Sequence, residues 1–290
     1  MDQANSLRRL AEKSRLQRVP RRTEPLRTIA ITSGKGGVGK TNVVVNLAMA
    51  MSRLGRKVLV IDADLGLANV DVVLGLTPRF TIRDVLTGAK AVDEVVIQGP
   101  DDIMILPSAS GVAELSNLTR DEKLLLLQEL DGMATEADVI LIDTSAGIND
   151  TVLYFNTAAQ DRLVVATGEP TSLTDAYALI KVLYTQHQER RFKLLVNNVA
   201  DIAEAKRVYR KLTTATDHFL GGLSIEYLGF LPTDHAVHQA VMLQKPVLEA
   251  FPQAAVSKQF LALAKDLLEA PPDETSGNIK FFWRRLVAMA

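Results

Sequence analysis

A glycine-rich segment near the start of the chain carries the residues best suited to phosphate chemistry. It lies between an apolar run of strand character and a stretch with helical spacing. Glycines let successive backbone N–H groups turn toward one anion, and a helix N-terminus adds partial positive charge. Lys40 supplies a full charge for the β- and γ-phosphates, and the Thr41 hydroxyl can bind Mg²⁺. The spacing predicts a phosphate-binding loop made of Gly34, Lys35, Gly36, Gly37, Val38, Gly39, Lys40 and Thr41.

Acidic residues follow two later apolar runs. Asp62 and Asp64 come after residues 58–61, and Asp143 comes after residues 139–142. Open α/β sheets bind ligands outside the carboxyl ends of their strands, so these carboxylates are expected near the phosphate loop. From the residues alone, each could instead cap the next helix, and Lys35 could be a solvated loop residue. A carboxylate that orients water, with Mg²⁺ and lysines that neutralise the leaving phosphoryl group, favours hydrolysis. Phosphoryl transfer is less favoured because no acceptor-binding domain is visible.

The elements that must position these residues follow from hydrophobic periodicity. Continuous apolar runs that alternate with amphipathic stretches indicate a parallel sheet covered on both faces. The predicted fold class is α/β, a P-loop NTPase with a mostly parallel central sheet flanked by helices. Strands are expected at 26–32, 58–61, 103–106, 139–142, 163–166, 194–196 and 225–230, and helices at 41–54, 120–134, 173–187, 203–219 and 254–268. Proline-punctuated linkers divide the chain into an arm and linker (1–25), one domain (26–269), and a linker with a C-terminal amphipathic helix (270–290).

Composition narrows the function further. The chain has 290 residues, no cysteine and four histidines, which excludes disulfides and thiolate metal ligands. Its net charge of −1 combines +5 over residues 1–27, +3 over residues 277–290 and −9 between them. Direct DNA binding is therefore disfavoured, because it needs many cations presented together. The chain shows neither a signal peptide nor a run of about 18 apolar residues, so we expect a soluble, cytoplasmic protein.

The loop also resembles a known motif. Lys-Gly-Gly-Val-Gly-Lys-Thr at residues 35–41 is similar to the deviant Walker A motif of the MinD/ParA class of P-loop ATPases. The resemblance implies ATP or ADP with Mg²⁺ and a homodimer around ATP, in which Lys35 reaches the partner's phosphates. It implies catalytic roles for Lys35, Lys40 and Asp64, the last orienting water. It further implies Mg²⁺ binding by Thr41, Asp62 and Asp143, with Gly147 near the γ-phosphate, and adenine contacts from Asn197, Pro232 and Asp234. From the residues alone, Asn197 is as well explained as a turn former.

Within this class, the arm resembles one family. Residues 2–8 match the Asp-Gln-Ala-x-x-Leu-Arg motif of the FlhG family, also called FleN or YlxH. The resemblance implies a regulator of flagellar number and placement that activates the signal-recognition-type GTPase FlhF. It also implies contacts with flagellar switch proteins or a flagellar transcription activator. The residues that would contact FlhF are Asp2, Gln3, Ala4, Leu7 and Arg8. The alternatives are a ParA-like DNA-partition ATPase, a MinD-type division-site ATPase, or an adaptor that sequesters an activator.

The C-terminal segment has the pattern of an interfacial helix. Read as a helix, it places Ile279, Phe282, Trp283 and Leu286 on one stripe, with Lys280, Arg284 and Arg285 on the flanks and back. Apolar and aromatic residues with basic flanks are typical of a helix that lies on an anionic membrane surface. Three cations contribute roughly 3 kcal/mol, which is weak for one copy and stronger for a dimer. We therefore expect peripheral attachment to the cytoplasmic membrane in the ATP-bound dimer. The alternative is a helix that packs on the domain itself.

Overall fold

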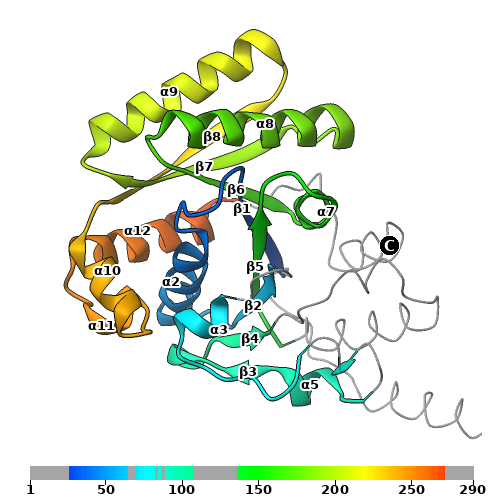
Figure 1. The fold of residues 1–290 in the computed structure, drawn as a ribbon, viewed down its shortest axis with the longest axis vertical. Helices are drawn as coiled ribbons and strands as arrows, with labels where there is room; N and C mark the ends of the chain where they lie inside the picture. The colour runs from blue at the N-terminus through cyan, green and yellow to red at the C-terminus, as the bar shows by residue number, and fades with distance from the viewer. Residues whose placement is uncertain (1–25, 65–68, 82–83, 86–88, 108–135, 272–290) are drawn as a thin grey trace, which may run out of the picture.

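A computed structural model describes residues 26–64, 69–81, 84–85, 89–107 and 136–271 (Figure 1). The arm with its FlhF-type motif, the C-terminal amphipathic segment and the predicted helix at 120–134 lie outside these residues. No helix in the described part of the chain is both long and apolar enough to span a bilayer.

One sheet organises the described residues, with the strand order β3-β4-β2-β5-β1-β6-β7-β8. Neighbouring strands pair in parallel, except for the edge pair β3 and β4, which is antiparallel. The strands are β1 (Arg27–Ser33), β2 (Val58–Ala63), β3 (Ile97–Gln98), β4 (Met104–Leu106), β5 (Val139–Ala146), β6 (Asp161–Ala166), β7 (Arg191–Val199) and β8 (Ser224–Pro232). The central strands β1, β2, β5 and β6 are buried along most of their length, as parallel strands between two helical layers must be.

Helices cover both faces of this sheet. Helices α2 and α12 pack on one face, and α7, α8 and α9 lie on the other (Figure 1). Alternate residues of β1 pack on opposite faces of the sheet. Ile29 and Ile31 belong to the core with α2 and α12, and Ala30 belongs to the core with α7. The helices are α2 (Lys40–Arg53), α3 (Val70–Val73), α5 (Val92–Val95), the 3₁₀ turn η1 (Pro100–Asp102), α7 (Asp150–Ala158), α8 (Pro170–His187), α9 (Ile202–Phe219), α10 (His235–Met242), α11 (Val247–Ala250) and α12 (Ala255–Glu269).

The predicted fold class is confirmed, with differences in detail. Strands β5 and β7 run several residues further than expected, so Asp143 and Asn197 lie within strands rather than after them. The reason is that polar side chains at a strand's carboxyl end still permit ladder hydrogen bonds, although they interrupt the apolar pattern. The edge strand β3 and the helices α3, α5, α7, α10 and α11 were not predicted. Strand β3 has only two residues, too few for a periodic signal.

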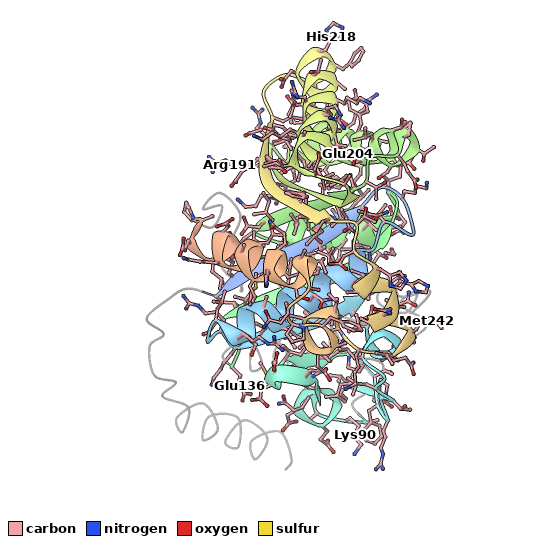
Figure 2. The ribbon with its side chains drawn as sticks, turned by 90° about the vertical axis from the view of Figure 1, so that its left-hand side faces the viewer. Lys90, Glu136, Arg191, Glu204, His218 and Met242 are labelled. Atoms are coloured by element: carbon pink, nitrogen blue, oxygen red, sulfur yellow. The ribbon has the colours of Figure 1, made fainter. Side chains whose placement is uncertain are left out.

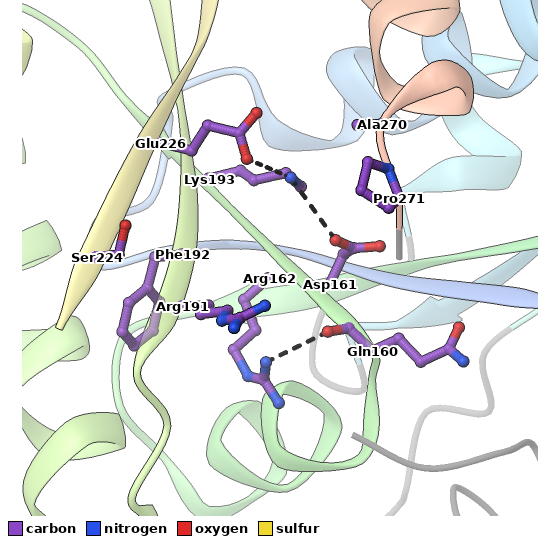
Figure 3. Close-up of a pocket in the computed structure, with 10 residues that line it drawn as sticks. All are labelled: Gln160, Asp161, Arg162, Arg191, Phe192, Lys193, Ser224, Glu226, Ala270 and Pro271. Atoms are coloured by element: carbon purple, nitrogen blue, oxygen red, sulfur yellow. Dashed lines mark hydrogen bonds and ion pairs between the residues drawn. The ribbon is translucent and has the colours of Figure 1, made fainter. Parts of the chain in front are cut away.

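A cluster of charged residues lies at the end of the sheet where β1 and β6 begin, which is the end away from the phosphate loop. Arg27, the first residue of β1, pairs with buried Asp161 at 2.8 Å and donates hydrogen bonds to the carbonyls of Leu267 and Ala270 at the end of α12. Lys193 lies between Asp161 and Glu226 (Figure 3).

These charges border a cavity of about 200 Å³ beside Ala270 and Pro271. Arg191, also on its wall, is exposed, and its side chain projects outward (Figure 2). The cluster ties the first strand to the last helix of the domain.

We predict that Arg27→Gln lowers the free energy of unfolding by about 3–5 kcal/mol, because it leaves the buried Asp161 carboxylate with only the longer contact to Lys193, at 3.9 Å. Urea unfolding followed by circular dichroism measures this change. The control is Lys245→Gln, which breaks the exposed pair with Glu249 and should cost about 0.5 kcal/mol or less. Equal effects of the two substitutions would show that burial does not set the strength of the Arg27 pair.

Candidate nucleotide site

The phosphate loop occupies the turn between β1 and α2. Gly37 and Gly39 have φ values of +78° and +87°, a region that favours glycine. Gly39 is the N-cap of α2, and no side chain caps that helix. The first turn of α2 also contains no acidic residue. Its N-terminal N–H groups therefore remain available to an anion, as the sequence predicts.

Neighbouring elements hold the loop at both sides. At Gly34, a Cβ atom would lie 2.1 Å from the carbonyl carbon and oxygen of Asp175 in α8, so only glycine fits. The Ser33 hydroxyl donates to the Lys35 carbonyl at 2.9 Å. The N–H of Gly147, after β5, donates to the Ser33 carbonyl at 2.9 Å. The segment around Gly147 thus lies directly against the start of the loop.

Lys40 and Asp143 form the centre of the site. Their Nζ–Oδ1 distance is 2.6 Å, and both side chains are almost fully buried. Asp62 and Asp143 are paired residues on the adjacent strands β2 and β5. Burial raises the pKa of Asp143, against the lowering effect of Lys40 and the Thr41 hydroxyl. Burial, with the charge of Asp143, raises the pKa of Asp62 to about 7. The site therefore has more buried carboxylate than its one lysine neutralises.

These residues fit a magnesium–phosphate complex. Asp143 Oδ2 is buried and accepts no hydrogen bond from the described residues. The described residues contain no group of three or more histidine or acidic side chains placed to hold a metal ion. Mg²⁺ does not require such a cage, because it binds one or two carboxylates and takes its other oxygens from water and substrate phosphates. The orphaned oxygen and the raised pKa values indicate that a cation would be stabilised here.

Asp64 lies just beyond the end of β2 and is half-buried. Its N–H donates to Asp62 Oδ1 at 3.1 Å. Its charge contributes to the raised pKa values of both Asp62 and Asp143, so the structure brings all three carboxylates together. Residues 65–68, which follow it, lie outside the described part of the chain.

Lys35 points away from the Lys40–Asp143 pair. Its Nζ contacts Glu169 Oε2 at 2.7 Å and Thr171 Oγ1 at 2.9 Å. Both side chains of the ion pair are partly exposed, 37% for Lys35 and 63% for Glu169. Within a single chain, then, the side chain of this loop lysine is held at the N-terminus of α8 by Glu169 and Thr171.

The residues that are expected to contact adenine lie at or near the ends of β7 and β8. Asn197 is half-buried, and its Nδ2 donates to the Val38 carbonyl of the phosphate loop at 2.7 Å. Pro232 ends β8. Asp234 caps α10 through Ala236 N–H and also accepts a hydrogen bond from Val256 N–H. All three lie near one another, but both oxygens of Asp234 already have partners within the protein.

Sequence reasoning missed Glu169, Thr171 and Asp175, which hold the loop from α8. They are more than 130 residues from Lys35 along the chain. Their segment follows β6 in the same way that the loop follows β1, and β1 and β6 are adjacent in the sheet. Strand order was the missing information, since the acidic and hydroxyl residue types alone give no such signal.

The site and the sheet together define a P-loop ATPase of the MinD/ParA class. Residues 26–196 match the AAA domain family. The chain is 46% identical to the antiactivator FleN of Pseudomonas aeruginosa over 264 residues, 91% of this chain and 94% of that protein. The chain belongs to the FleN/FlhG family of MinD-like ATPases.

Two further comparisons agree. The chain is 32% identical to the flagellum site-determining protein YlxH of Helicobacter pylori, with 89% of each chain covered. MinD of Pyrococcus horikoshii, solved as a complex with Mg-ADP, superposes with a TM-score of 0.66 at 26% identity, over 88% of this chain and 98% of that one. The protein is an ATPase, and its family supports nucleotide and Mg²⁺ binding.

The carboxylate cluster predicts how stability changes with pH in the nucleotide-free protein. The pKa of Asp62 is about 7 when folded and about 3.9 when unfolded. Between these values the folded state binds more protons, so the free energy of unfolding falls as pH rises. We expect Asp62→Asn to reduce this fall, and to stabilise the protein more at pH 8 than at pH 5. Thermal unfolding without nucleotide measures both effects, with Asp84→Asn as the control at an acidic residue outside this carboxylate cluster. An identical pH slope in wild type and Asp62→Asn would contradict the prediction.

Proposed function

We propose that this protein regulates flagellar number and placement as a switch that dimerises around ATP and returns to the monomer after hydrolysis. The observation that carries the proposal is the position of Lys35. It lies in the phosphate loop, yet it is held at the exposed edge of α8 and plays no part in the buried Lys40 pair. A cation in that place is free to serve the nucleotide of a second copy once its exposed contacts are released.

The remaining residues divide the work of hydrolysis. Lys40 binds the β- and γ-phosphates, and Thr41, Asp62 and Asp143 hold Mg²⁺, which neutralises the leaving phosphoryl group. Asp64, beside them, orients the attacking water. Asn197, Pro232 and Asp234 lie on the purine side. The excess carboxylate charge at the centre supports this division, because a divalent cation would offset the burial and the Asp143 charge that raise the pKa of Asp62.

The dimer is tested with a variant that binds ATP without hydrolysing it. We expect Asp64→Ala to elute as a dimer with Mg-ATP and as a monomer with Mg-ADP. Adding Lys35→Ala should return the ATP form to monomer, because the charge on the partner's phosphates is lost. Size exclusion with light scattering measures the mass. If Asp64→Ala remains a monomer under saturating ATP, the proposed switch is wrong.

Glu169→Gln gives a graded test of the same switch. It removes the exposed partner of Lys35, so dimerisation should tighten by up to about fivefold, the range expected for a surface ion pair. Glu249→Gln, which removes the exposed partner of Lys245, is the matched control and should have no effect. Weaker dimerisation in Glu169→Gln would mean that Glu169 supports Lys35 in the dimer and does not restrain it in the monomer.

In this proposal, the two ends of the chain contact the GTPase partner and the membrane. The arm, through Asp2, Gln3, Ala4, Leu7 and Arg8, activates an FlhF-type GTPase. The domain contacts flagellar switch proteins or a flagellar transcription activator, which is in keeping with the name antiactivator given to its FleN relative. Residues 270–290, through Ile279, Phe282, Trp283 and Leu286, attach the dimer peripherally to the cytoplasmic membrane.

Membrane attachment has a direct test. A chain that ends at Pro272 should lose ATP-dependent sedimentation with anionic vesicles while still dimerising with ATP. The loss should be much smaller with zwitterionic vesicles, because three cations of the tail contribute roughly 3 kcal/mol near an anionic surface. If truncation leaves binding to anionic vesicles unchanged, the segment belongs to the domain and not to the membrane.

A further inference from the structure

The side chain of Asn197 connects the end of β7 to the phosphate loop. Its Nδ2 donates to the Val38 carbonyl at 2.7 Å, across 159 residues of sequence. Its Oδ1 accepts from the N–H of Asn198 at 2.9 Å. Both polar ends of the amide are therefore engaged within the protein, which leaves one N–H and one lone pair of the oxygen for any ligand.

This hydrogen bond fixes the orientation of the peptide group between Val38 and Gly39 in the phosphate loop. The carbonyl of Val38 and the N–H of Gly39 belong to one planar trans peptide, so they point in opposite directions. When Asn197 holds the carbonyl toward β7, the Gly39 N–H is turned away from β7. Gly39 is the N-cap of α2, with φ of +87°, and a Cβ atom there would lie 2.5 Å from Asn197 Nδ2. The amide thus packs directly against the residue whose N–H it orients.

The contact extends to the purine side of the site. Asn198 has a left-handed φ of +57°, and its Oδ1 accepts from the Thr233 hydroxyl at 2.9 Å. The Thr233 N–H donates to the Val199 carbonyl at 2.9 Å. One line of hydrogen bonds therefore joins the segment after β8, through Asn198 and Asn197, to the phosphate loop.

We propose that Asn197 is a positioning residue for the phosphate loop, and that it contributes to the affinity for the phosphates whatever the base. The proposal rests on the nucleotide site proposed above. It differs from an adenine contact in one consequence. A base contact affects only ligands that carry the base, whereas a positioned Gly39 N–H affects every ligand that carries the phosphates.

The test compares two ligands by calorimetry: Mg-ATP and Mg-tripolyphosphate, which has no base. Asn197→Asp keeps the acceptor for Asn198 N–H but replaces the donor with a carboxylate that faces the Val38 carbonyl. Asn197→Ala removes both and guards against misfolding of the first variant. Both should weaken ATP and tripolyphosphate by similar factors of about tenfold, the upper range for one hydrogen bond. The ratio of ATP to GTP affinity should stay unchanged.

Asn198→Gly is the matched control, since glycine tolerates the left-handed φ of +57°, removes the bond to Thr233 and leaves the bond to Val38. It should change tripolyphosphate binding by less than about twofold. Equal thermal midpoints of the variants separate positioning from loss of fold.

The proposal is overturned if the Asn197 variants weaken ATP alone, which indicates a base contact, or weaken neither ligand. It is also overturned if the wild type binds ATP but not tripolyphosphate. Failure of the wild type to bind Mg-ATP overturns instead the nucleotide site itself.

Discussion

The buried pair of Lys40 and Asp143 is the interaction on which the site depends. The 2.6 Å contact places one cation among three carboxylates, and it neutralises only the nearest of them. Parallel pairing of β2 with β5 forces Asp62 beside Asp143, so the excess negative charge is built into the sheet. Such an unfavourable arrangement of charge occurs in folded proteins at sites where a bound ligand compensates for it. A magnesium–phosphate complex would supply the missing cation and a second anion for Lys40.

Besides the ion pairs of Lys35 and Lys40, three contacts hold the backbone of the phosphate loop and of the adjoining Ser33. Gly34 packs on the α8 backbone at Asp175, Gly147 donates to Ser33, and Asn197 holds Val38. Each contact comes from a different strand–helix unit: β6–α8, β5–α7 and β7–α9. The conformation of the loop therefore depends on the positions of all three units. A shift of any one of them would change the direction of the N–H groups in the loop.

Sequence alone gave the phosphate loop, its acidic neighbours and the parallel sheet, because each has a local signal. The glycine spacing predicts the turn in which Gly37 and Gly39 have positive φ angles, and apolar runs predict the strands whose last residues include Asp62 and Asp143. The partners of Lys35 could not be found in this way. Glu169 and Thr171 reach it only because β6 lies next to β1, and strand order is decided by packing over the whole chain. The same limit applies to Asn197, whose turn-forming residue type conceals a contact with the loop.

Strands β1 and β6 are joined by an ion pair at each end, and burial makes the two pairs different. Arg27 and Asp161, where the strands begin, have side chains 8% and 3% exposed, so separating them leaves a charge in a poorly solvated place. Lys35 and Glu169, beyond the strands' carboxyl ends, are 37% and 63% exposed, so water replaces either partner at little cost. One end of the strand pair is therefore fixed and the other can change partners. The fixed end lies beside residues 26 and 271, and the exchangeable end lies at the phosphate loop. A firmly held strand end with a labile ion pair at the phosphate loop suits the proposed switch between one copy and two.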